Sequence, residues 1–86
     1  MVRSIYPIRA EFVRKCGELL NIAKPNFVSC EIMYGIDIPK RPVVTFHPDD
    51  QYVVVTCESG FTYEINIEAC SLAEIAAEIF LKMLYK

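Results

Sequence analysis

The chain has 86 residues, of which 53% are hydrophobic and 23% are charged, and its formal net charge at pH 7 is −2. This length allows one hydrophobic core, so we expect a single domain over residues 1–86, and the composition excludes a disordered tail. No run approaches the ~18 consecutive apolar residues of a transmembrane helix, and the opening stretch MVRSIYPIRAEF lacks the apolar core of a signal peptide. We therefore predict a small cytoplasmic domain that does not enter a membrane.

Residues 8–23 show the spacing of an amphipathic helix, with Pro7 suited to its start and Pro25 to its end. Gly17 lies inside this helix, where it costs up to about 1 kcal/mol relative to Ala. We expect Gly17 to mark a close packing contact. The apolar positions that we expect to face the core are Ile8, Phe12, Cys16, Leu19, Leu20 and Ala23.

From Phe27 onward the apolar period changes to two, which is typical of strands with one buried face. In the second of the expected strands, Val44 and Phe46 face inward. Pro48 takes the second position of a type I turn over residues 47–50. Short connections favour an antiparallel meander of the four strands. Their predicted ranges are 27–34, 43–47, 51–57 and 61–67.

The turn between the last two strands decides which side chains share a face. A two-residue loop at Ser59-Gly60 pairs Thr56 with Tyr63, whereas a three-residue loop over 58–60 puts Gly60 in the left-handed region. We predict the three-residue loop because it collects the apolar side chains on one face. The other face then displays Thr45, Tyr52, Val54, Thr56, Thr62, Glu64 and Asn66.

Ser71 followed by Glu74 is a capping box, and it predicts that the last helix begins near Ser71. The polar stripe of this helix is narrow, and its apolar arc spans roughly 240°, more than the coverage of a sheet requires. One side, around Ile75 and Ile79, covers the sheet. The surplus is expected to form a partner or dimer interface: Ala77, Phe80, Leu81, Leu84 and Tyr85. Alternatively, part of this surplus apolar surface packs against the first helix.

These elements predict an α+β domain of order α-β-β-β-β-α, in which both helices pack on one face of a four-stranded antiparallel sheet. The order is similar to that of double-stranded RNA-binding domains, as topology only. This chain has one strand more, and Glu74 and Glu78 stand at the start of the last helix, where lysines would be needed to contact phosphates.

No residue pattern predicts catalysis, a metal or a cofactor. His47, the only histidine, lies beside Asp49 and Asp50 in an expected turn that offers no pocket. Cys70 precedes a helix N-terminus, where the dipole favours a thiolate, but no base is expected within reach. All four cysteines occupy apolar patterns without a CxxC or Cys/His pair, so we predict reduced thiols and no zinc site. They are Cys16, Cys30, Cys57 and Cys70.

Charge is distributed unevenly along the chain. Residues 1–41 carry seven Lys/Arg and four Asp/Glu, a net of +3, whereas residues 42–86 carry two and seven, a net of −5. Such an acidic half attracts a basic partner, although solubility alone is an alternative explanation. The acidic residues expected to form the partner-binding surface are Asp49, Asp50, Glu58, Glu64, Glu68, Glu74 and Glu78.

The function predicted is that of a non-enzymatic inhibitor or adaptor, which binds a larger protein with a basic surface, for example one that holds nucleic acid. Small phage or mobile-element proteins that block host nucleases, anti-CRISPR proteins among them, are an analogy of kind only. The alternative is a homodimeric structural subunit assembled through the last helix. A third interpretation is direct nucleic-acid binding by the basic first helix, through Arg9, Arg14, Lys15 and Lys24.

Overall fold

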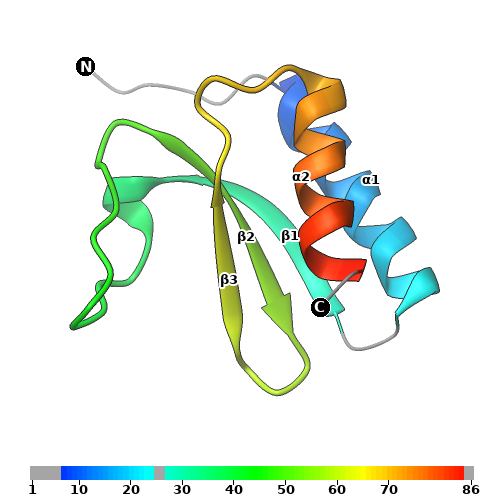
Figure 1. Cartoon of the computed structure of the whole chain (residues 1–86), viewed down its shortest axis with the longest axis horizontal. Coiled ribbons are helices and arrows are strands. Elements are labelled where there is room, and N and C mark those ends of the chain that lie inside the picture. The colour runs from blue at the N-terminus through cyan, green and yellow to red at the C-terminus, as the bar shows by residue number, and fades with distance from the viewer. Residues whose placement is uncertain (1–6, 25–26, 85–86) are drawn as a thin grey trace.

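A three-stranded antiparallel sheet and two helices make up the fold, as the computed structural model shows for residues 7–24 and 27–84. Figure 1 shows α1 and α2 side by side on one side of the sheet. The predicted α+β class, both helices and the meander are confirmed, but with three strands in the order β1-β2-β3. The elements are α1 (Pro7–Ala23), β1 (Phe27–Tyr34), the short 3-10 helix η1 (Gly35–Asp37), β2 (Gln51–Cys57), β3 (Thr62–Asn66) and α2 (Leu72–Leu84).

The predicted strand over residues 43–47 is wrong. These residues belong to a long connection, residues 35–50, which we call the β1–β2 loop. β1 pairs directly with β2, with Tyr34 opposite Gln51, and the other edge of β2 pairs with β3. Both edges of β2 are therefore occupied. The excluded segment is short and lies between Pro42 and Pro48, neither of which can donate a ladder hydrogen bond.

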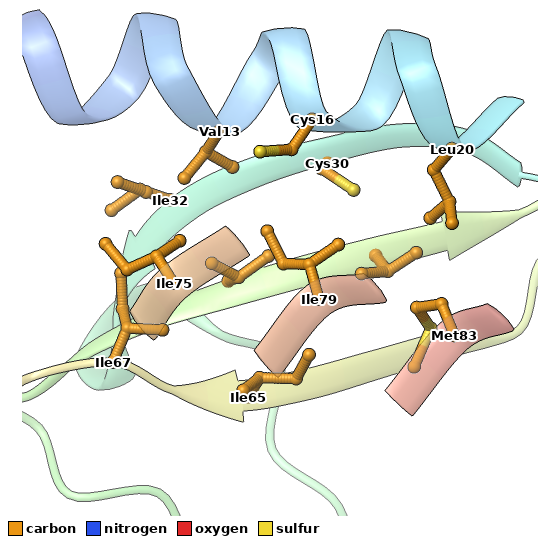
Figure 2. Packing of buried hydrophobic residues seen from close by; sticks show 12 residues of the cluster. Val13, Cys16, Leu20, Cys30, Ile32, Ile65, Ile67, Ile75, Ile79 and Met83 are labelled. Atoms are coloured by element: carbon orange, nitrogen blue, oxygen red, sulfur yellow. The ribbon is translucent and has the colours of Figure 1, made fainter. Parts of the chain in front are cut away.

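Side chains from both helices and from one face of the sheet form the main core (Figure 2). Ile75, Ile79 and Met83 of α2 are buried in it, as are Val53 and Val55 of β2. The prediction that Ile75 and Ile79 cover the sheet is confirmed. The core members from α1, β1 and β3, together with the residue that follows β3, are Val13, Cys16, Leu20, Cys30, Ile32, Ile65 and Ile67.

The buried face of α1 agrees with the prediction only in part: Cys16 and Leu20 are buried and Phe12 packs against the core, whereas Ala23 is exposed. Val13 is fully buried, whereas Ile8 and Leu19 are 72% and 58% exposed. The close approach of α1 to β1 sets this rotation, because a Cβ on Gly17 would lie only 3.0 Å from the backbone nitrogen of Cys30. The packing contact predicted at Gly17 is confirmed, and it turns Leu19 away from the core.

The local signals at the β2–β3 turn and at the start of α2 are confirmed. The backbone N–H of Cys57 donates to the carbonyl oxygen of Phe61 at 2.8 Å, which encloses a three-residue loop. Gly60 has a φ of 88°, in the left-handed region. Ser71 and Glu74 exchange the two hydrogen bonds of a capping box, at 3.0 and 3.2 Å.

The second face of the sheet is displayed only in part: Asn66 is exposed as predicted, but other predicted members are covered. Tyr52 and Val54 are buried there with Ile38, and Met33 and Phe46 pack against them. The β1–β2 loop supplies Ile38 and Phe46, so β2 is buried on both faces. Figure 1 shows this loop on the side of the sheet away from the helices.

Candidate interaction surface

The base of the β1–β2 loop is closed by backbone hydrogen bonds. The N–H of Gly35 donates to the carbonyl oxygen of Asp50 at 2.9 Å, and the N–H of Ile36 donates to that of Pro48 at 3.2 Å. The predicted turn over residues 47–50 is present, with the N–H of Asp50 donating to the carbonyl oxygen of His47. A Cβ on Gly35 would lie 2.0 Å from this same oxygen, so only glycine fits.

A small apolar cluster holds the next part of the loop against the sheet. The rings of Phe46 and Tyr52 meet edge to face, with centroids 5.3 Å apart. The Tyr52 hydroxyl accepts a 2.9 Å hydrogen bond from the backbone N–H of His47. Ile38 is buried against Tyr52 and Val54. These contacts fix both arms of the loop near its base.

Arg41 ties the loop to β3. Its Nη2 lies 2.6 Å from Oε2 of Glu64, and it also donates to the carbonyl and hydroxyl oxygens of Thr62. The Glu64 side chain is only 7% exposed, and the Thr62 hydroxyl donates to the same carboxylate oxygen at 2.8 Å. Glu64 is therefore a nearly buried carboxylate, neutralised by the loop that covers it.

Between these anchors the loop presents large apolar side chains to solvent. Val43 is 92% exposed and Ile36 is 75% exposed, and Val44 lies beside them at the surface. A groove of about 440 Å³ runs along the loop, with Ile36, Val44 and Phe46 in its lining. The connection is much longer than an ordinary hairpin loop of about two to five residues, and binding residues are found disproportionately on loops held by a rigid scaffold. We therefore take this loop as the candidate site.

The acidic residues predicted to form one surface are dispersed, and several have partners. Glu64 pairs with Arg41 as described, and Glu78 lies 3.1 Å from the Lys82 nitrogen on α2. Glu74 serves the capping box, and the hydrogen bonds from Ser71 lower the pKa of its carboxyl.

The remaining acidic residues lie at opposite ends of the β2–β3 hairpin. Asp50 accepts a hydrogen bond from the Asn66 amide at 2.9 Å, and Glu68 accepts one from the backbone N–H of Gln51 at 2.8 Å. Asp49 belongs to the same end, in the turn before β2. Glu58 is exposed in the β2–β3 turn, at the far end. The structure therefore brings Asp49, Asp50 and Glu68 to one end and leaves the others separate.

The apolar set predicted on α2 is divided in the same way. Leu81 is 60% exposed and Ala77 is at the surface. Phe80 and Leu84 are half-buried and pack against the core, as the intramolecular alternative anticipated. Tyr85 lies outside the described residues. Of the predicted interface, Leu81 is the one large side chain that the described part of the chain leaves mainly in solvent.

The residues considered for catalysis remain apart. His47 is exposed in its turn, with Nδ1 3.5 Å from Asp50. Burial raises the pKa of the Cys70 thiol, and the charges of Glu74 and Glu78 raise it further, which opposes a thiolate at this helix N-terminus. Within residues 7–24 and 27–84, no three His, Cys, Asp or Glu side chains are placed to hold a metal ion.

All four cysteines are free in the structure. Cys16 and Cys30 are buried beside each other between α1 and β1 (Figure 2). Burial raises the pKa of Cys30 to about 12, with smaller contributions from Cys16 and Cys57. None of the helices in the described residues is long and apolar enough to cross a membrane.

Two basic residues of α1, Arg9 and Arg14, make contacts within the protein. Arg9 donates to the side-chain oxygen of Gln51 at 2.5 Å and to the carbonyl oxygens of Ile67 and Cys70 at 2.9 and 3.0 Å. Arg14 pairs with Glu11 on the same helix. Arg9 therefore joins α1 to the connection that leads into α2, and it is not available for a phosphate.

Comparisons with protein-family models, curated proteins and solved structures found no match for this chain. One of the two differences from double-stranded RNA-binding domains disappears in the structure, because the extra strand is absent. The other remains, since Glu74 and Glu78 occupy the start of the last helix.

Sequence reasoning missed the β1–β2 loop as a site because the alternation in VVTFH resembles a strand. A signal was nevertheless present. This segment contains Pro39, Pro42 and Pro48, which disfavour a strand inside a sheet. Lys40 and Arg41 also lie close to its apolar residues in the sequence.

Proposed function

We propose that this chain is a cytoplasmic, non-enzymatic protein-binding domain that acts as an inhibitor or adaptor of a larger protein, with the β1–β2 loop as its main binding element. The observation that carries the proposal is the 92% exposure of Val43 at the tip of a loop whose base is fixed. A valine there contributes nothing to the core.

The anchoring of the loop supports this proposal energetically. A flexible segment loses conformational entropy when it becomes ordered on binding, and this loss lowers the affinity. A loop that is held in one conformation before binding loses less entropy on association. Here the backbone bonds at Gly35, the ring contact between Phe46 and Tyr52, and the Arg41 tether supply that order. Apolar side chains gathered at the surface of such an element are typical of protein interaction sites.

The acidic residues have a secondary part in this proposal. Asp49, Asp50 and Glu68 lie together at the end of the sheet from which the loop emerges. Exposed charges there steer a basic partner toward the loop, and this contribution weakens as salt screens them within about 8–10 Å. We expect them to change the association rate more than the final affinity.

The test compares two charge insertions at exposed apolar positions. Val43→Asp alters the loop tip, and Leu19→Asp is the matched control on α1, on the other side of the molecule. Both substitutions are at the surface, so we expect each to change the free energy of unfolding by about 0.5 kcal/mol or less. Tagged protein of each kind is used to capture a partner from native host cells, and the partner is then measured by quantitative mass spectrometry.

We expect a protein that the wild type and Leu19→Asp retain and that Val43→Asp loses, with salt slowing its association. If Val43→Asp retains the same partner at the same affinity, the loop is not the binding element and the proposal is wrong.

A homodimer through α2 is the second candidate, and one feature favours it. Leu81 and Phe61 are both about 60% exposed, and they line a groove of about 450 Å³ between α2 and β3. In this alternative, wild type sediments as a dimer and Leu81→Glu as a folded monomer. A monomeric wild type would exclude it.

A further inference from the structure

We infer that the groove of the β1–β2 loop binds a partner segment in which an apolar residue adjoins an aspartate or glutamate. This inference rests on the proposed function and specifies the chemistry of the partner. It concerns the concave side of the loop, whereas the exposed Val43 marks its tip.

The groove has the size and the lining of a peptide-binding site. Its volume of about 440 Å³ is within the 300–1,000 Å³ typical of ligand pockets. Apolar side chains line most of it, including Ile36, Ile38, Val44 and Phe46. Ile38 and Phe46 are held by the cluster around Tyr52, so this wall exists before a ligand arrives.

The charged residues in the groove lining are both cations, Lys40 and Arg41. Arg41 is partly neutralised by Glu64, but its described bonds all leave from Nη2, and Nη1 has no partner among the described residues. Lys40 is exposed, and the described part of the chain offers it no ion pair.

No acidic residue lines the groove, although the loop contains three. Asp37 lies in η1, and Asp49 and Asp50 lie in the turn before β2, and none of the three is among the lining residues. Both charged side chains in the groove lining are therefore basic, although the chain is acidic overall. An apolar side chain in the groove places a neighbouring carboxylate beside Lys40 and Arg41, where it gains charge-assisted hydrogen bonds.

Short peptides test this inference. The probe is a fluorescein-labelled peptide blocked by an acetyl group and an amide, with the sequence Gly-Ser-Leu-Glu-Leu-Glu-Ser-Gly. Two matched peptides replace either both glutamates with glutamine or both leucines with alanine, and a third carries a free C-terminal carboxylate. Binding is measured by fluorescence polarisation, and the site is located from amide chemical shifts.

We expect the leucine–glutamate peptide to bind about tenfold more tightly than either matched peptide, with shifts confined to the β1–β2 loop. Lys40→Glu should abolish the preference for glutamate, while Lys15→Glu, an equal charge change on α1, should leave it intact. A free carboxylate should add no affinity.

The inference is overturned if no peptide binds at millimolar concentration, if the glutamine peptide binds equally well, or if Lys40→Glu binds as wild type does. The proposed function would still hold if partner capture depended on Val43. That experiment tests the loop tip and does not depend on the charge of the groove.

Discussion

Gly35 is the position at which a single methyl group should have the largest effect on the β1–β2 loop. A Cβ at this residue would lie 2.0 Å from the carbonyl oxygen of His47, 2.8 Å from its carbonyl carbon and 3.1 Å from Cε1 of Tyr52. Two of these three atoms are backbone, so no side-chain rotation relieves the contact. In Gly35→Ala the two arms of the loop must therefore move apart by more than 1 Å, on the order of a third of a van der Waals contact distance.

That displacement breaks the hydrogen bonds that Gly35 and Ile36 donate to Asp50 and Pro48. Each is worth about 0.5–1.5 kcal/mol net, and forcing an extra methyl into a packed site costs about 1–3 kcal/mol. We expect Gly35→Ala to lower the free energy of unfolding by about 2–6 kcal/mol, which is a large part of the stability of a domain this small. Urea denaturation followed by circular dichroism measures it.

Gly60→Ala is the matched control. Gly60 has a φ of 88°, but a Cβ there meets nothing within 4 Å, so the cost is backbone strain alone, roughly 1–2 kcal/mol. The binding assay adds a second readout, because Gly35→Ala should also release the loop and weaken partner capture. If Gly35→Ala is as stable as wild type, or no less stable than Gly60→Ala, the arms of the loop do not meet as described.

Three further predictions concern charges and thiols. Arg41→Ala leaves the nearly buried Glu64 carboxylate without its cation, and we expect the free energy of unfolding in urea to fall by about 1–3 kcal/mol, less than for a fully buried pair because Arg41 is 36% exposed. Adding Glu64→Gln should recover part of this loss, whereas additive effects of the two substitutions would contradict the tether. The pKa of Glu74 is lowered in the folded protein, so its contribution to stability is present above the unfolded-state pKa and is lost as pH falls through the folded-state pKa. The melting temperatures of wild type and Glu74→Gln should therefore differ at pH 7 and converge in acid, and a difference that stays constant with pH would exclude this role. In the folded protein, iodoacetamide at pH 8 should modify half-buried Cys70 well before Cys30, whose pKa is raised to about 12 by burial. Protein that is unfolded without a reductant should show four reactive thiols, and a mass gain on reduction would reveal a disulfide instead.

The features that the sequence alone determined are those governed by near neighbours in the chain. The capping box at Ser71 and Glu74, the left-handed Gly60 and the turn after His47 each depend on residues within four positions of one another. Side-chain chemistry and backbone sterics decide such features locally, so a pattern of residue types is enough to predict them.

Tertiary structure decided which elements meet. An alternating period identifies a strand but not its partner, and VVTFH alternates as a strand would while β1 pairs with β2 and leaves it out. The rotation of α1 likewise follows from the contact of Gly17 with Cys30, which spacing along the helix does not contain. Helical spacing therefore predicted Leu19 in the core, and packing placed Val13 there.

The same distinction applies to the candidate site. The sequence shows that Glu64 is acidic and Arg41 is basic, but only the fold brings them to 2.6 Å, twenty-three positions apart in the chain. This pairing takes Glu64 out of the expected acidic surface and fixes the β1–β2 loop, which leaves Val43 in solvent. Exposure of an apolar residue is a property of what packs around it, and for this loop that was decided by strand pairing far from Val43 itself.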